Sequence, residues 1–153
     1  MSEQNRALID TFYEAFARRD ADAMNACYHP EVEFSDPAFG ELQGDEARAM
    51  WTMLCKRGKD LKIEHRDVAA DATTGSAHWE ARYTFAASGK PVHNVVEARF
   101  TFEDGLIRTH TDVFDFSRWA SQALGIPGKL LGRTAFFQSA FQRKARALLA
   151  KQS

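Results

Sequence analysis

Residues 77–86, AHWEARYTFA, and residues 92–102, VHNVVEARFTF, alternate apolar and polar side chains along most of their length. A period of two is typical of a β-strand with one buried face, because successive side chains point to opposite sides of a sheet. Residues 61–68, LKIEHRDV, and 106–116, LIRTHTDVFDF, show the same pattern, and turn-forming segments separate all four runs. The spacing therefore predicts an antiparallel meander of four strands.

The alternation also assigns the two faces of this sheet. Thr and charged residues of both signs fall on one face, which suits hydration or a polar homodimer interface. The other face is mostly apolar and aromatic, and includes Trp79, Ala81, Tyr83, Phe85, Asn94, Val96, Ala98, Phe100, Phe102, His110, Asp112, Phe114 and Phe116.

Helical periodicity precedes the meander. Residues 4–18 and a segment opening at Gly44-Asp45 each carry an apolar stripe, with a short helix over 21–27 and a short strand over 31–36 between them. An amphipathic sheet must cover its apolar face. The sequence thus predicts an α+β fold: a cone-shaped, curved antiparallel sheet covered on its concave face by N-terminal helices, with an additional C-terminal helix.

The C-terminal part is basic, because residues 118–153 hold seven Lys or Arg and no Asp or Glu. We expect a short helix over 117–125 and a last helix over 134–151 with an apolar stripe. The expected organisation is one α+β domain over 1–125, with a loop and basic amphipathic helix over 126–153 packed on it. The alternative is that this basic helix contacts a partner protein.

Composition narrows the function classes. The chain has 153 residues, 44% of them hydrophobic, twelve Phe and a net charge of −1, which argues against nucleic-acid binding. No run approaches the ~18 apolar residues of a membrane span, so a soluble protein is expected. Cys27 and Cys55 lack CxxC spacing and the N-terminus lacks a signal peptide, so we expect a cytoplasmic protein. No sequence motif for a cofactor or metal is present, so none is expected.

Polar residues on the apolar face point to a small-molecule pocket. Asn94, His110 and Asp112 fall there, His65 joins them if its strand continues inward, and Asp36 can point to the same space. Carboxylates among aromatic rings have a raised pKa and suit acid/base catalysis. The expected lining for a small hydrophobic ligand or substrate is Phe12, Tyr13, Phe34, Trp51, His65, Trp79, Tyr83, Asn94 and Phe114.

Each polar residue also has a structural interpretation. Asp36 precedes Pro37 and can form a turn, and Asp115 can cap the helix that starts near 117. His65 and His110 can be hydrogen-bonded core residues.

The stretch FYEAFARRDADAMNACYHPEVEFSDPAFGELQGDEARAMW at 12–51, the four hairpin strands, and HTDVFDFSRWASQALG at 110–125 together resemble the SnoaL-like branch of the nuclear-transport-factor-2-like superfamily. The resemblance spans roughly residues 5–125. It implies a cone-shaped α+β fold with a deep pocket, usually a homodimer packed through the outer sheet face. The superfamily includes isomerases, cyclases, dehydratases, epoxide hydrolases and non-enzymatic binders.

The resemblance also implies site residues. Ketosteroid isomerases carry a similar Asp-Pro-x-Gly segment with the Asp as the proton-shuttling base, and Asp36 matches it. Their oxyanion tyrosine falls on Phe12, with Tyr13 one position away, and their protonated Asp falls on Ala98. SnoaL-like cyclases use an Asp ahead of a Gln-x-Leu-Gly-like run, and Asp115 matches that position.

Four catalytic candidates follow from the residues and the resemblance: Asp36, His110, Asp112 and Asp115. The expected function is a cofactor-independent isomerase, cyclase or dehydratase that transfers protons on a hydrophobic, carbonyl-containing substrate. A non-catalytic hydrophobic ligand-binding module and an interaction protein using the basic C-terminal helix are the alternatives.

Overall fold

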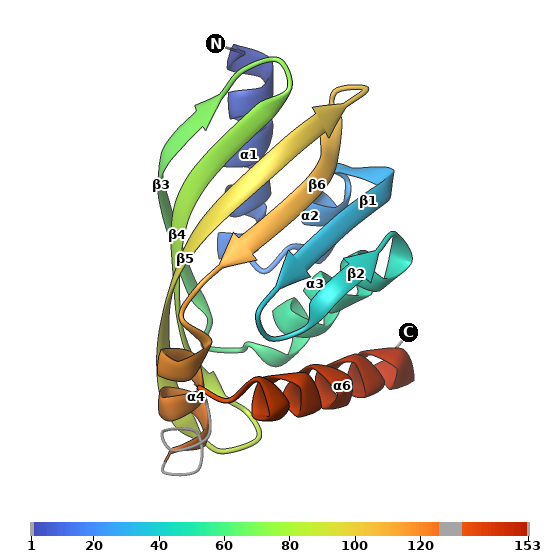
Figure 1. Ribbon diagram of the computed structural model, residues 1–153. Coiled ribbons are helices and arrows are strands. Elements are labelled where there is room, and N and C mark those ends of the chain that lie inside the picture. Colours follow the sequence, from blue (N-terminus) through green and yellow to red (C-terminus); the bar gives the residue numbers. More distant parts are fainter. Residues whose placement is uncertain (1, 126–132, 153) are drawn as a thin grey trace.

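The computed structural model describes residues 2–125 and 133–152. They form a six-stranded sheet with helices packed on one face and at one end (Figure 1). In chain order the elements are α1 (Glu3–Ala17), α2 (Ala21–Asn25), β1 (Tyr28–Asp36), β2 (Gly40–Gln43), α3 (Asp45–Arg57), β3 (Lys62–Ala70), β4 (Thr74–Phe85), β5 (Lys90–Glu103), β6 (Leu106–Val113), α4 (Phe116–Leu124) and α6 (Ala135–Gln152).

The predicted α+β class, with a curved sheet covered by helices, is confirmed, with one correction to strand direction. The strand order is β2-β1-β6-β5-β4-β3, and the meander β3 to β6 is antiparallel as predicted. However, β1 pairs with β6 in parallel, so the sheet is mixed. Local alternation could not reveal this, because the whole meander separates β1 from β6 in the sequence.

The sequence prediction also missed β2. This strand has four residues, of which only Leu42 is fully buried, so it offers too little alternation to detect. It pairs antiparallel with β1 through Asp36↔Gly40 and Phe34↔Leu42. Gly40 has a φ of +76°, which an L residue rarely adopts, so glycine suits this tight return.

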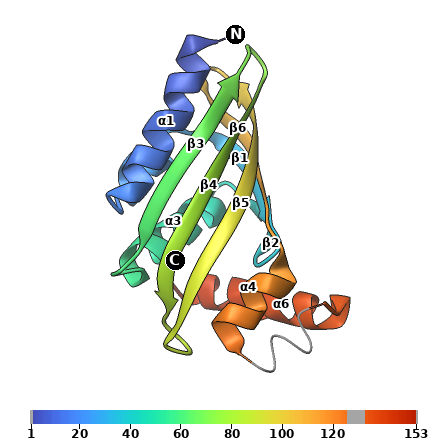
Figure 2. The same cartoon turned by 90° about the vertical axis from the view of Figure 1, so that its left-hand side faces the viewer.

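The helices α1 and α3 cover the concave face of the sheet (Figure 2), and α2 packs against both of them. Side chains of Ser2 and Asp20 cap α1 and α2 by accepting from backbone N–H groups three residues on. The core is aromatic: Phe12 and Phe16 of α1 both make edge contacts with Trp51 of α3, at centroid distances of 5.6 and 5.0 Å. This packing fills the end of the cone under α1 and leaves the other end to α4 and α6.

The helix α6 lies across that other end, below α3 and the β1–β2 turn (Figure 1). Gln138 and Gln142 each donate from Nε2 to the carbonyl of Pro37, at 3.0 and 3.1 Å, and Arg146 donates to the carbonyl of Phe39 at 2.8 Å. Its apolar side packs on α4, with Phe141 against Trp119 at 5.0 Å. The basic C-terminal helix therefore contacts the body of this same chain.

The outer face of the sheet is polar, as the alternation predicts. His78 is hydrogen-bonded to Glu80 at 2.8 Å and to Glu97, and Glu80 also pairs with His93 at 2.7 Å.

Within residues 2–125 and 133–152, no helix has both the length and the apolar character to cross a membrane.

Candidate active site

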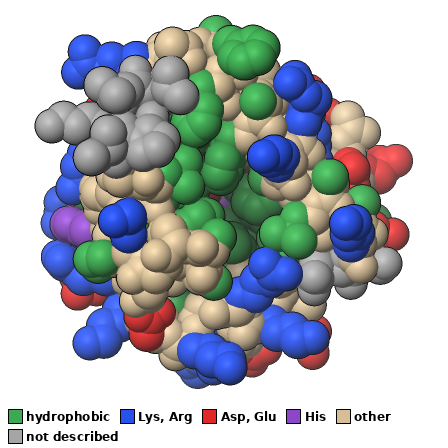
Figure 3. Space-filling view, turned by 90° about the horizontal axis from the view of Figure 1, so that it is seen from below, with side chains coloured by type: hydrophobic (Ala, Val, Ile, Leu, Met, Phe, Trp, Pro, Cys, Tyr) green, Lys and Arg blue, Asp and Glu red, His purple; other side chains and the backbone are tan. Residues whose placement is uncertain are grey.

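A cavity of about 600 Å³ opens at the end of the cone that α4 and α6 partly cover. Figure 3 looks into this end and shows a hollow lined by hydrophobic side chains, with Lys and Arg on several sides. The size is in the range of small-molecule sites. The lining is largely aromatic and aliphatic, and its members from the sheet include Trp79, Ala81, Tyr83, Phe85, Asn94, Asp112 and Phe114.

Asp36 lies at the end of β1, in the wall of this cavity. Its Oδ1 accepts from the backbone N–H groups of Ala38 at 2.9 Å and Phe39 at 2.6 Å. The other oxygen, Oδ2, accepts no hydrogen bond from the residues that the structure describes. Asp36 is thus both a turn former and a cavity residue, and the two interpretations of the sequence are compatible.

The surroundings of Asp36 raise its pKa to about 7. Burial among apolar groups is the largest cause, and the negative charge of Asp112 adds to it. The two backbone N–H groups that stabilise the ionised form oppose the rise only in part. A carboxyl with such a pKa exchanges protons near neutral pH.

Asp112 lies beside Asp36 on the neighbouring strand. The parallel register pairs Phe34 with His110 and Ser35 with Thr111, so the next step along both strands brings the two aspartates together. Adjacent strands are about 4.8 Å apart. Asp112 is 3% exposed, and its Oδ1 accepts from Nε2 of His110 at 2.8 Å and from Nε1 of Trp79 at 3.2 Å.

A series of buried hydrogen bonds links Asp112 to the core through His110. Trp51 Nε1 donates to the Tyr28 hydroxyl at 2.8 Å, and that hydroxyl lies 2.7 Å from Nδ1 of His110. Because an indole N–H only donates, the Tyr28 oxygen accepts from it, and the Tyr28 proton is free for Nδ1. With its proton on Nε2, His110 donates to Asp112 and accepts from Tyr28, so both ring nitrogens are hydrogen-bonded.

Tyr83 and Asn94 supply the neutral polar groups of the cavity. The Tyr83 oxygen accepts from Trp119 Nε1 at 2.8 Å, which leaves its own proton available, and burial raises the Tyr83 pKa so that the hydroxyl stays protonated. Asn94 is 8% exposed, and its amide has no hydrogen-bond partner in the described part of the chain. A buried amide without a partner in a cavity wall is suited to bind a ligand.

The structure brings together Asp36, Trp51, Trp79, Tyr83, Asn94, Asp112 and Phe114 at the cavity. Phe12, Tyr13 and Phe34 instead lie in the core, where Phe12 and Phe34 contact His110 at centroid distances of 5.5 and 5.0 Å. They were expected at the pocket, but α1 fills that end of the cone. His110 is also fully buried and reaches the cavity only through Asp112.

Two further candidates lie away from the cavity. His65 pairs through Nε2 with Asp10 of α1 at 2.8 Å and stacks on Tyr13, so α1 covers it. Asp115 is exposed and caps α4 by accepting from the N–H of Arg118 at 3.1 Å. The structure therefore supports the interpretation of Asp115 as a helix cap.

Apart from Trp51 of α3, the sequence predictions missed the part of the lining that comes from helices. Alternation along strands reports only the sheet face, whereas α3, α4 and α6 also contribute. The spacing of Phe137 and Phe141 was visible as a stripe but was interpreted as packing alone. The helical lining includes Met50, Met53, Arg57, Trp119, Phe137, Phe141 and Lys144.

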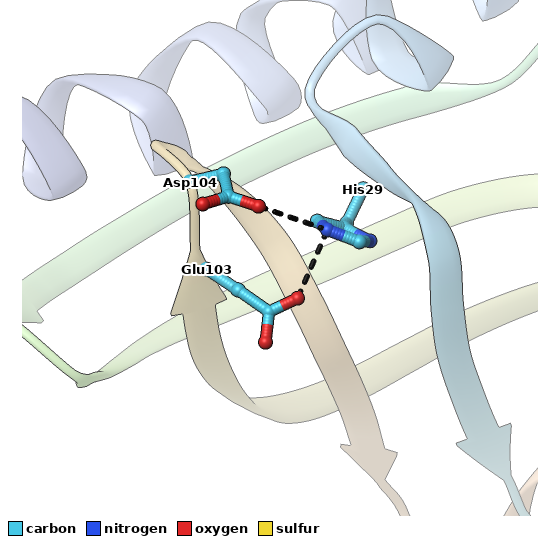
Figure 4. A group of neighbouring side chains, drawn as sticks. All are labelled: His29, Glu103 and Asp104. Atoms are coloured by element: carbon cyan, nitrogen blue, oxygen red, sulfur yellow. Dashed lines mark ion pairs between the residues drawn. The ribbon is translucent and has the colours of Figure 1, made fainter.

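A separate acidic cluster lies at the opposite end of the sheet. Nε2 of His29 is 3.0 Å from Glu103 and 3.4 Å from Asp104 (Figure 4). Nδ1 of His29 accepts from the N–H of Glu31 at 3.0 Å, which places the ring proton on Nε2, facing the carboxylates. Arg108 also approaches Glu103, at 3.7 Å. His29 therefore hydrogen-bonds to the carboxylates as a neutral ring, and Arg108 is the cation that pairs with Glu103.

The fold and the cavity define a class: an α+β cone of the nuclear-transport-factor-2-like type with carboxyl groups on the inner sheet face. Within it, the family model of the SnoaL-like domain matches residues 9–110, so the chain belongs to the SnoaL-like family. None of the curated proteins matches this sequence.

Solved structures agree with this assignment. A candidate polyketide cyclase from Xanthomonas campestris is 26% identical, with a TM-score of 0.62 over 79% of this chain and 98% of that one. TsrD from Streptomyces laurentii is 23% identical, with a TM-score of 0.67 over 82% and 99%. A candidate ketosteroid isomerase from Kribbella flavida is 19% identical, with a TM-score of 0.59 over 74% and 78%.

Proposed function

We propose that this protein catalyses cofactor-independent proton transfer at a carbon next to a carbonyl, on a hydrophobic substrate held in the cavity. The observation that carries the proposal is the pair Asp36 and Asp112, on neighbouring strands in the wall of a largely apolar cavity. A base with a pKa of about 7 is about half ionised at neutral pH and is a stronger proton acceptor than an ordinary carboxylate. An isomerase or cyclase of the SnoaL-like type is the reaction class that this arrangement suits.

Asp36 is the proton acceptor in this proposal. Its Oδ1 is fixed by two backbone N–H groups, and its Oδ2 is free to take the substrate proton. Asp112 strengthens the base by its negative charge. His110 touches no substrate and instead orients Asp112 through Nε2.

The enolate formed by proton removal needs hydrogen-bond donors. The Asn94 amide and the Tyr83 hydroxyl are the uncharged donors that face the cavity. Each donor aimed at a developing oxyanion contributes about 3 kcal/mol in well-studied enzymes. We therefore assign to these two side chains the stabilisation of the enolate oxygen.

Hydrogen–deuterium exchange at the carbon acid 2-tetralone, a bicyclic aromatic ketone, tests this function without the natural substrate. In D₂O the protein should speed exchange of the protons next to the carbonyl, and Asp36→Asn should abolish the gain. Asp115→Asn is the matched control, because the same chemical change is made at an exposed cap that Asn also satisfies.

Equal exchange rates with the protein and with buffer would contradict catalysis. If 2-tetralone nevertheless binds, the result would favour the ligand-binding alternative, for which the apolar lining is sufficient. Loss of exchange in Asp115→Asn with retention in Asp36→Asn would move the base to Asp115.

A further inference from the structure

The charges that line the cavity are separated by sign. The two carboxyl groups, Asp36 and Asp112, come from the inner face of the sheet, whereas the two cations, Arg57 and Lys144, come from helices α3 and α6. Both cations are exposed, whereas Asp112 is buried. The negative charge therefore lies deep in the cavity and the positive charge lies at its opening, in agreement with the Lys and Arg side chains around the hollow in Figure 3.

Arg57 and Lys144 have no partner among the described residues, unlike those cations of the chain that pair with carboxylates or carbonyls. Arg48 pairs with Asp45 at 3.0 Å, Arg108 pairs with Glu33 at 3.1 Å, and Arg146 donates to a backbone carbonyl. In the described residues, neither Arg57 nor Lys144 makes a hydrogen bond or an ion pair. The helices that carry them, α3 and α6, contact each other, and both side chains line the cavity.

This arrangement favours one orientation of a charged ligand. An anionic group is repelled by the carboxylates at depth and attracted by the cations at the opening, while the apolar lining accepts the rest of the molecule. A neutral ligand would gain nothing from the two cations. A cationic ligand would be repelled at the opening.

We propose that the ligand of this cavity is an amphipathic organic anion, with an apolar body and a carboxylate that Arg57 and Lys144 bind at the opening. The next step rests on the proposed function. The anionic end also determines how far the apolar part of the ligand enters the cavity, and it places the reacting carbon beside Asp36. The two cations are thus specificity-determining residues for an organic acid.

Two probes of similar shape, one anionic and one neutral, test the proposal: naphthalene-2-carboxylate and naphthalene-2-carboxamide, titrated by calorimetry. The wild-type protein should bind the carboxylate about tenfold more tightly than the amide, which corresponds to one charge-assisted hydrogen bond. Arg57→Met with Lys144→Met should remove this preference, since Met keeps an apolar stem and loses the charge.

The chain offers matched controls for both cations. Lys56 and Arg143 are the preceding residues on the same helices, are exposed, and do not line the cavity. Lys56→Met with Arg143→Met removes the same net charge and should keep the preference. For the wild-type protein, a rise in salt from about 0.05 to about 0.5 M should weaken binding of the carboxylate and leave the amide unchanged.

Three results would overturn the proposal: no binding of the carboxylate, equal affinity for the two probes, or a preference that survives in the cavity double variant. Asp36→Asn separates this proposal from the catalytic one. It should keep or increase the preference for the carboxylate, because it removes a negative charge, while abolishing proton exchange. In Asp36→Asn, loss of the preference together with loss of exchange would contradict only the anion site, whereas unchanged exchange with the preference kept would contradict only the catalytic role of Asp36.

Discussion

Asp112 on β6 is paired in register with Ala98 on β5. Side chains directly opposite each other in an antiparallel pair have Cβ atoms about 5 Å apart. The resemblance to ketosteroid isomerases places their protonated Asp at Ala98, so this chain carries a carboxyl group one strand away from that position. The second carboxyl of the site is displaced to the neighbouring strand, where it also lies beside Asp36.

Asp112→Asn should lower the pKa of Asp36. The negative charge of Asp112 contributes to the raised pKa, while burial is the larger cause, so the pKa should fall below about 7 and stay above the ordinary value of 3.8. Carbon-13 NMR titration of the carboxyl group measures this. Asp115→Asn serves as the control, and an unchanged or higher Asp36 pKa in Asp112→Asn would contradict electrostatic coupling of the pair.

Asp36→Asn should stabilise the fold above pH 7. The folded-state pKa is raised from 3.8 to about 7, so as pH rises through this window the unfolded chain ionises while the native carboxyl keeps its proton. Native stability falls over that window by about 2–4 kcal/mol, and Asn, which has no proton to lose, avoids this cost.

Urea unfolding at pH 4 and pH 8 gives the comparison. The variant should resemble the wild type at pH 4 and be more stable at pH 8. A variant that is less stable at pH 8 would show that the ionised form of Asp36 is favoured in the native state.

The fold followed from the sequence because both of its main signals are local. Alternation over 61–116, a helical stripe over 4–18 and a second stripe that opens at Gly44-Asp45 are each visible in a short window. The parallel pairing of β1 with β6 is a contact between distant segments, and β2 is too short to show a pattern. These two features became visible only in the structure.

The part of the cavity lining that lies on strands could be expected from the sequence. Asp36, Asn94 and Asp112 could be placed by alternation, whereas the depth of His110 could not, because alternation does not distinguish a core position from a cavity wall. His65 was placed inward, yet α1 covers it. Arg57 and Lys144 were missed because helix packing, which brings them to the opening, depends on the tertiary arrangement.

Tyr28→Phe should destabilise the protein by about 2–4 kcal/mol. The change removes the hydroxyl that accepts from Trp51 and donates to His110, and leaves both buried groups unpaired. Tyr13→Phe is a matched control, because the buried Tyr13 hydroxyl has no hydrogen-bond partner in the described chain. Denaturant unfolding should show Tyr13→Phe as neutral or stabilising, and equal losses in the two variants would refute the proposed series of hydrogen bonds.

Arg146→Ala should raise the pKa of Asp36. Arg146 holds the carbonyl of Phe39, the residue whose N–H stabilises ionised Asp36, so loosening this turn weakens that hydrogen bond. Arg143→Ala removes the same charge from an exposed position of α6 without a contact to the turn. Carbon-13 titration of both variants decides the question, and equal shifts would mean that only the charge of α6 matters.

We expect the protein to form a homodimer through the outer face of the sheet. Val113 is 53% exposed on this face, opposite Glu97, so a dimer packed through the face would bury it. Val113→Glu should convert a dimer to monomers in sedimentation velocity, because it adds a charge opposite an existing carboxylate. Phe136→Glu, at an 81% exposed position on α6, should leave the dimer intact. A wild-type protein that sediments as a monomer at about 100 μM, well above the micromolar affinity of a modest interface, would rule out this assembly.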